Sequence, residues 1–145
     1  TADSPWIEQI GLATSRDLKT WTRCADNPLI PVGPQGAFDD VFCSDPCVLR
    51  CGETWVMFYY TLSSDGRARD TAAFSEDLVH WRKSNEILVD LGGPGSIDAT
   101  YAHKPAVFSE DGRLYHYYCA VSPAKEKTIG NVEVQEIRGI ALAVP

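Results

Sequence analysis

The chain has 145 residues, of which 44% are hydrophobic and 10% aromatic, a composition typical of one globular domain rather than a disordered segment. Its formal net charge is −7 and it has no basic cluster, which excludes a nucleic-acid or anionic-membrane surface, because either needs a basic patch. No apolar run approaches the length of a membrane span. From the charge and the short apolar runs together, we expect neither nucleic acid nor a membrane as a partner.

Short apolar runs and turn signals alternate along almost the whole chain, which predicts β-strands and no helix. In chain order, strands are predicted over 7–15, 20–23, 47–49, 55–60, 71–74, near Trp81, and over 106–108, 114–119 and 137–144. The strands at 47–49 and 106–108 are expected to start at Pro46 and Pro105, because proline is tolerated at the first position of a strand. The Asp111-Gly112 pair that follows the second run is a strong hairpin signal.

The same segment occurs twice in the chain. Trp21 and Trp81 are 60 residues apart, and Pro46 and Pro105 are 59 apart, so the register is kept to within one residue. A period of this length, filled with short strands, is typical of a radial β-repeat in which four antiparallel strands make one blade. We therefore predict one all-β domain, a partial β-propeller of about two blades plus a half. Its parts are an outer half-blade over 1–26, a full blade over 38–84 and the inner part of the next blade over 97–145.

The residues that the two copies share are interpreted as scaffold. Asp17 and Asp77 are expected to cap the backbone of their turns, while Leu18, Leu78 and the tryptophans pack between blades. His116 lies within an aromatic strand and is expected to be a packed or inter-blade residue.

The chain has five cysteines, Cys24, Cys43, Cys47, Cys51 and Cys119. Three of them lie at steps of four, which suits metal binding on a helix but not on a strand, where such side chains are far apart. Buried free thiols are the preferred interpretation, and neither a metal nor another cofactor is expected. An odd count and the absence of a signal peptide at the start favour a cytoplasmic setting.

Polar residues ahead of the two prolines are the candidates for chemistry. Alignment on the prolines pairs Asp39 with Asp98, Ser44 with His103 and Asp45 with Lys104. The first strand of a propeller blade is the innermost, so these residues should meet near a central pocket. The repeated aspartates are equally compatible with loop anchors, and His103 with an ordinary loop histidine.

Arg69 and Arg138 lie near the start of the predicted third strands, where Arg138 is taken to occupy the position of Arg69 in the full unit. Together with Lys104 they are candidates for binding substrate. Carboxylates, an imidazole and cations that converge from neighbouring blades suit hydrolysis of a glycosidic bond, in which one carboxylate activates water and a protonated group assists the leaving oxygen.

The turns TSRDLKTW and FSEDLVHW, and the runs SDPCVL, HKPAVF and DGRLYHYYCAV, resemble five-bladed β-propeller glycoside hydrolases, in particular families 43 and 117 and uncharacterised relatives. The resemblance covers nearly the whole chain. It implies inversion at the anomeric carbon, and Asp45 matches the family aspartate that precedes proline at an inner strand. His103-Lys104-Pro105 stands where the family often has another aspartate before proline. In this the chain resembles family 117 more, in which a histidine takes part near the leaving group, and this resemblance makes His103 the candidate acid.

A five-bladed ring needs roughly twice this length, so the resemblance also implies that the ring is completed by something else. We expect a homo-oligomer, most simply a dimer, because a partial propeller exposes strand edges and apolar blade faces. Two functions remain open. In the first, the chain hydrolyses a glycosidic bond in an oligo- or polysaccharide, with Asp45 or Asp39 activating water and His103 or Asp98 as acid or orienting group. In the second, it is a non-catalytic carbohydrate-binding or scaffold module that lacks the general acid.

Overall fold

The structure is a computed structural model that describes residues 6–125, 128–129 and 131–143. These residues form strands and no helix. None of the described residues therefore belongs to a helix that could cross a membrane. The strands are β1 (Ala13–Thr14), β2 (Thr22–Arg23), β3 (Phe42–Cys51), β4 (Thr54–Leu62), β5 (Ala68–Ser75), β6 (Arg82–Lys83), β7 (Tyr101–Glu110), β8 (Arg113–Pro123), β9 (Thr128–Ile129), β10 (Val132–Glu133) and β11 (Glu136–Ala143).

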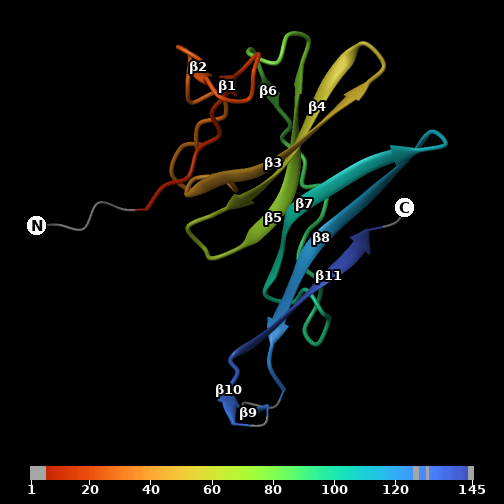
Figure 1. Ribbon diagram of the computed structural model, residues 1–145. Helices are drawn as coiled ribbons and strands as arrows, with labels where there is room; N and C mark the ends of the chain where they lie inside the picture. Colours follow the sequence, from red (N-terminus) through yellow and green to blue (C-terminus); the bar gives the residue numbers. More distant parts are fainter. Residues whose placement is uncertain (1–5, 126–127, 130, 144–145) are drawn as a thin grey trace, which may run out of the picture.

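The strands are grouped into blades (Figure 1). Strands β3, β4, β5 and β6 form a complete antiparallel blade, and β7, β8 and β11 form the inner three strands of the next. A parallel contact between Ala68 of β5 and Tyr101 of β7 joins the two blades. The short pair β1–β2 lies beside the full blade, and the β9–β10 hairpin extends from the end of β8. The chain is therefore an all-β partial propeller, as expected; the exact residue ranges assigned to its blades stay a prediction.

Two details of the predicted strands are wrong. β3 and β7 do not start at their prolines but run through them, because a bulge absorbs Pro46 and Pro105 and no ladder hydrogen bond is required of them. The predicted strand over 7–15 is also shorter than expected. Only Ala13–Thr14 pair as a strand, while Glu8 and Ile10 make isolated bridges to Phe42 and Ile30.

The repeated turns have the same hydrogen-bond network in both copies. The Ser15 hydroxyl accepts the Leu18 N–H at 2.9 Å, and the Ser75 hydroxyl accepts the Leu78 N–H at 2.9 Å. Asp17 and Asp77 each accept two backbone N–H groups further along the turn, which confirms their capping role. Leu78 is half-buried, but Leu18 is 81% exposed, so its predicted burial between blades does not occur in the described residues.

The hydrophobic core lies in layers between the blades. One layer, built around Met57 and Tyr59, is covered by Ile10 and Ile30 from the N-terminal segment. A second, built around Val56 and Phe58, is covered by Val107 of the next blade. β4 alternates between these two layers, which explains why both of its faces are buried. The full blade is thus packed on both faces, by the N-terminal segment on one side and by the next blade on the other.

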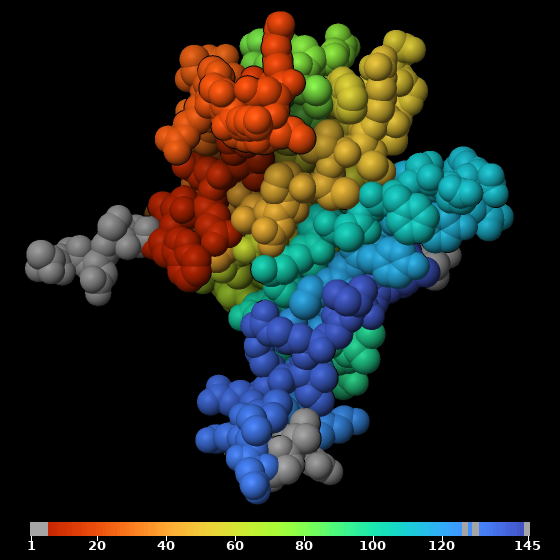
Figure 2. Space-filling model, viewed as in Figure 1, coloured from red at the N-terminus to blue at the C-terminus, as the bar shows by residue number. Residues whose placement is uncertain are grey.

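The second blade, formed by β7, β8 and β11, is less covered by other parts of the chain. β11 is the last strand of the seven-stranded sheet, and Ile137 and Ile140 on it are exposed. In the space-filling view the N-terminal segment lies against the full blade, whereas the β7–β8 hairpin and the β9–β10 hairpin extend away from the body (Figure 2).

Candidate functional site

A β-bulge interrupts the inner strand of each blade at the same place in the repeat. The pairing of β3 with β4 shifts between Ser44 and Cys47, and the pairing of β7 with β8 shifts between His103 and Ala106. The extra residues, Asp45 and Lys104, have φ angles of 49° and 63°. This left-handed conformation is costly for residues with a β-carbon, and bulges often redirect side chains beside active sites. We call Asp45 and Lys104 the twin bulge residues.

The twin bulge residues meet across the boundary between the two blades. Lys104 Nζ lies 3.2 Å from Asp45 Oδ2, and both side chains remain about half exposed, at 49% and 47%. The same ammonium lies 5.9 Å from the centre of the Tyr60 ring. The sequence comparison placed Asp45 and Lys104 at equivalent positions, and the structure brings them into an ion pair that is accessible from solvent.

His103 lies directly before one bulge and is only 5% exposed. Its Nδ1 is 3.1 Å from the Cys119 carbonyl oxygen, which can only accept, so Nδ1 carries the proton. Its ring meets Tyr60 edge to face at 5.3 Å. Burial, helped by the charge of Lys104, lowers the pKa of His103 below its ordinary value. The imidazole is therefore uncharged near neutral pH, which does not favour the acid role inferred from the resemblance.

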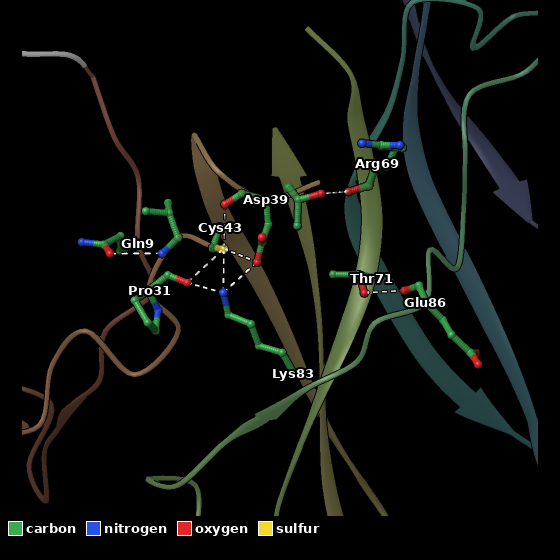
Figure 3. A network of polar contacts seen from close by, with 10 residues as sticks. Gln9, Pro31, Asp39, Cys43, Arg69, Thr71, Lys83 and Glu86 are labelled. Atoms are coloured by element: carbon green, nitrogen blue, oxygen red, sulfur yellow. Dashed lines mark hydrogen bonds and ion pairs between the residues drawn. The ribbon is translucent and has the colours of Figure 1, made fainter. Parts of the chain in front are cut away.

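Asp39 has a different environment from Asp45 (Figure 3). It is 4% exposed, and its Oδ2 is 2.7 Å from Lys83 Nζ and 3.7 Å from the Cys43 sulfur. Lys83 also donates to the Pro31 carbonyl. A carboxylate that is buried against its own cation holds the loop and β6 together. Its contacts favour the loop-anchor interpretation over a role in activating water.

Asp98 is the counterpart of Asp39 and is also held by its own blade. The Tyr118 hydroxyl donates to Asp98 Oδ2 at 2.7 Å. Burial acts to raise the pKa of Asp98, but hydrogen bonds from Tyr118 and Ser96 outweigh it, so the pKa is lowered. Each aspartate also lies against a glycine six residues earlier, Gly33 or Gly92, where a β-carbon would overlap the carboxylate. This repeated close approach indicates that both aspartates shape their loops.

The two arginines are not equivalent, so this part of the alignment was wrong. Arg69 pairs with Thr61 on β4, whereas Arg138 pairs with Val121 on β8. In the repeat Val121 corresponds to Leu62, which pairs with Ala68, so Arg138 occupies the position of Ala68. A slip of one residue reverses the face of a strand, and the two arginines therefore point to opposite faces of their blades.

The local partners of the arginines differ as well. Arg69 donates to the Ser63 hydroxyl at 3.0 Å, and its Nε is buried with no hydrogen-bond partner among the described residues. Arg138 is paired with Glu136 on its own strand, at 2.7 Å from Nε. Its charge is among those that lower the pKa of His103, so of the two arginines it is the one that acts on the region of the bulges.

Sequence reasoning missed two residues beside the bulges. The Tyr60 hydroxyl donates to Glu8 Oε2 at 3.1 Å, and Glu8 is bridged through its backbone to the start of β3. In the sequence Tyr60 is one more strand aromatic, and Glu8 comes from a segment with no equivalent acid in the other copies. Only the folded contact between the N-terminal segment and the full blade brings them into this region.

A third missed residue, Asp70, lies deeper between the blades. It is fully buried, and its Oδ2 is 2.9 Å from His116 Nε2, whereas Oδ1 has no partner among the described residues. Burial raises the pKa of Asp70 to about 6, although the hydrogen bond from His116 acts in the opposite direction. The expectation that His116 is an inter-blade residue is confirmed, and its partner is an unexpected acid.

The surface cavities lie away from the twin bulge residues, whereas Cys47 and Cys119 lie close to the bulges. All five cysteines are free, and burial raises the pKa of Cys43 to about 12. In the part of the chain that the structure describes, no three potential metal ligands are grouped. A cavity of about 470 Å³ lies at the Asp77–Trp81 turn and one of about 380 Å³ at the equivalent Asp17 turn. The twin bulge residues form an open surface rather than a wall of either cavity.

Comparison with known proteins agrees with this architecture. No protein-family model matches the chain. Two curated proteins of Mycobacterium tuberculosis, uncharacterized protein Rv1502 and uncharacterized protein MT1551, are each 28% identical over 122 residues, which is 80% of this chain and 39% of theirs. The chain thus spans well under half the length of the curated relatives it matches.

Solved structures give the class of fold. A structure described as a glycoside hydrolase matches with a TM-score of 0.70 and 32% identity, over 94% of this chain and 36% of that one. A BT0996 RGII complex gives the same values. Zg3597, a family 117 glycoside hydrolase of Zobellia galactanivorans, matches with a TM-score of 0.74 over 97% of this chain and 40% of its own, at 19% identity, which shows the fold alone. The chain has a propeller-like glycoside hydrolase fold.

Proposed function

We propose that this chain forms part of a glycoside hydrolase that cleaves a glycosidic bond in an oligo- or polysaccharide, with inversion. The observation that carries the proposal is the pair of twin bulge residues, which presents a carboxylate and an ammonium 3.2 Å apart on an accessible surface between two blades. β-Bulges are often found beside active sites, where they redirect a side chain. The neighbouring glycoside hydrolases, one of them an RGII complex, support carbohydrate as the ligand.

In this proposal Asp45 takes a proton from the attacking water. Lys104 Nζ fixes the orientation of the carboxylate and donates to a sugar hydroxyl or carboxylate with its remaining N–H groups. His103, neutral and with Nδ1 occupied by Cys119, offers Nε2 as an acceptor for a sugar hydroxyl. Arg138 and Arg69 remain candidates for binding substrate further from Asp45. Asp39 and Asp98 act indirectly, by holding the loops that lead into the two bulges.

The second function is a non-catalytic carbohydrate-binding or scaffold module. The open surface around Asp45 favours this alternative, because catalysis benefits from walls that exclude water. The chain covers only 26% to 40% of the neighbouring glycoside hydrolases, so further blades would be needed to enclose a substrate. We propose that such walls come from a second copy, as the predicted dimer would provide, or from further blades of the same protein.

The two functions are separated by turnover. The wild-type protein is assayed for hydrolysis of a panel of aryl-glycosides and oligosaccharides, together with Asp45→Asn and a control, Asp26→Asn, at an exposed position. The hydrolase proposal predicts turnover that falls by about 100-fold or more in Asp45→Asn and is unchanged in the control. Saturable sugar binding without hydrolysis by the wild type would establish the module instead.

A further inference from the structure

Five ring side chains form a continuous row beside the twin bulge residues. In spatial order they are Trp6, Phe42, Tyr60, His103 and Tyr101, and successive ring centres lie 5.6, 6.5, 5.3 and 5.5 Å apart. These are the separations of aromatic rings in contact. We call this row the aromatic arc. It begins in the N-terminal segment, crosses β3 and β4 of the full blade and ends on β7 of the next blade.

The middle of the aromatic arc lies next to the ion pair of the proposed site. Tyr60 and His103 are 7% and 5% exposed, and the ring centre of Tyr60 is 5.9 Å from Lys104 Nζ. Phe42 and Tyr101 are only partly buried and occupy equivalent positions of the repeat, because each lies three residues before a twin bulge residue. The arc therefore has a buried centre at the ion pair and two more accessible arms.

Trp6 is the accessible end of one arm and has no counterpart on the other. Its side chain is 75% exposed, although a tryptophan that packs in a core buries a large apolar area. The backbone close to it is fixed, because the Glu8 carbonyl oxygen accepts the Cys43 N–H at 2.9 Å. The indole is thus presented to solvent by a segment that is tied to β3.

We propose that Trp6 and Phe42 form a second sugar-binding subsite, in which the C–H face of an uncharged sugar ring stacks on the exposed indole. This inference rests on the proposed function, because the stacked ring belongs to the same oligosaccharide that reaches Asp45. Three strand residues separate Phe42 from Asp45, about 10 Å at the rise of an extended strand. The ring on Trp6 is therefore a neighbour of the ring at Asp45.

The polar groups around Trp6 define the class of sugar. The face of an aromatic ring is electron-rich and attracts the C–H groups that line one face of a sugar. The indole N–H makes no hydrogen bond in residues 6–125, 128–129 and 131–143, unlike that of Trp81, which donates to the Leu78 carbonyl. It can donate to a hydroxyl at the edge of the sugar.

Glu8 lies two residues from Trp6 and accepts the Tyr60 hydroxyl at 3.1 Å. Its second carboxylate oxygen can accept a proton from a sugar hydroxyl, whereas its negative charge repels a sugar carboxylate. The subsite therefore suits a neutral sugar and disfavours an acidic one.

The first experiment uses the fluorescence of tryptophan. Neutral tetrasaccharides of pentoses or hexoses are titrated into the wild type, Trp6→Phe and the control Trp21→Phe, because Trp21 is also exposed, at 56%, but lies outside the aromatic arc. We expect a saturable change of emission in the wild type and in Trp21→Phe that is lost in Trp6→Phe. A sugar-induced change that persists unaltered in Trp6→Phe would overturn the inference.

The second experiment measures affinity by calorimetry, for the tetrasaccharide that binds most tightly and for its constituent monosaccharide. Trp6→Ala should bind the tetrasaccharide about 10-fold or more weakly and show a much smaller loss for the monosaccharide. Trp6→Phe, which keeps a ring, should recover part of the affinity. A Trp6→Phe as weak as Trp6→Ala would contradict stacking, and an acidic tetrasaccharide with the same dependence on Trp6 would contradict the choice of a neutral sugar.

Failure of this inference can be told apart from failure of the proposed function. If Trp6→Ala binds the tetrasaccharide as tightly as the wild type, and the amide signal of Asp45 still shifts, the subsite is wrong and the proposed function stands. If the wild type binds none of the sugars, both are overturned.

Discussion

Lys104 and Asp45 form an ion pair between neighbouring blades, 3.2 Å from Nζ to Oδ2, and each is the extra residue of a β-bulge that repeats about 59 residues apart. Both residues have positive φ angles. The repeated scaffold turns also have positive φ angles, at Leu18 and Leu78. What distinguishes the bulges is that they bring two opposite charges together on an accessible surface between blades, where an ion pair contributes little to stability.

Loss of this ion pair should leave the fold intact. Lys104→Met is expected to lower the free energy of unfolding by less than about 1 kcal/mol, because both side chains are about half exposed and solvent screens them. Urea denaturation measures the change, with Glu53→Gln, which removes another exposed pair, as the control. A loss of several kcal/mol would show that the pair is structural and would weaken the assignment of a functional site.

Lys83 should behave in the opposite way. Its ammonium neutralises Asp39, which is 4% exposed, and Lys83→Met would leave that carboxylate buried without a cation. A destabilisation of about 3 kcal/mol is expected in urea denaturation, compared with almost none for Lys19→Met in an exposed turn. If Lys83→Met unfolded at the wild-type urea concentration, Asp39 would not be the loop anchor described above.

Gly92 and Gly93 offer a matched pair of substitutions that tests the anchoring role of Asp98. A β-carbon at Gly92 would overlap the side chains of Ser96 and Asp98, whereas one at Gly93 would meet nothing within 4 Å. Gly92→Ala is expected to destabilise the protein by about 1–3 kcal/mol, and Gly93→Ala is not. Equal midpoints of thermal unfolding for the two variants would contradict the close packing of this loop.

Stability should depend on pH through Asp70. Its pKa is 3.8 in an unfolded chain and about 6 in the fold, so the folded state binds the proton more tightly. The resulting stabilisation is fully present below pH 3.8 and is lost as pH rises through about 6. Asp70→Asn is neutral throughout, so relative to wild type it should gain up to about 3 kcal/mol between pH 4 and pH 7.

Urea denaturation of both proteins at the two pH values, with Asp26→Asn as an exposed control, measures this difference. A stability difference between Asp70→Asn and wild type that is the same at both pH values would show that Asp70 is not held in its neutral form by burial.

The pKa values of two histidines should be shifted in opposite directions. Burial lowers the pKa of His103, whereas the Asp77 carboxylate, 2.6 Å from the His80 ring, raises the pKa of His80. NMR titration of the imidazole protons in the wild type separates them without any mutation. A His103 that titrates at or above the His80 value would restore the acid role that the sequence resemblance implied.

Much of the fold could be predicted from the sequence because the repeat shows it twice. The turns at Asp17 and Asp77 match in sequence and have the same hydrogen bonds, and the strand aromatics mark the inter-blade layers. The errors arose where one residue decides the outcome. A bulge at each proline added a residue, and a slip of one position misassigned Arg138.

The site was predicted only in part. Asp45, His103 and Lys104 were found because the copies differ there while the scaffold is kept. Glu8 and Asp70 could not be found in this way. Their partners, Tyr60 and His116, are 52 and 46 residues away in sequence, and the contacts depend on how the blades pack. The alignment also left the roles of Asp39 and Asp98 open, because a residue that repeats in both copies fits a loop anchor and a site residue equally well. Their contacts with Lys83 and Tyr118 in the fold favour the anchor role.

The most direct test of the central claim is where a sugar binds. The ¹⁵N-labelled protein is titrated with a defined panel of neutral and acidic oligosaccharides, and the shifted amide signals are mapped for the wild type and Asp45→Asn. We expect saturable shifts at Asp45, Tyr60, His103 and Lys104 that are strongly weakened in Asp45→Asn. Shifts confined to the cavity at the Asp77–Trp81 turn, or binding that is equally tight in Asp45→Asn, would contradict the assignment of the site to the twin bulge residues.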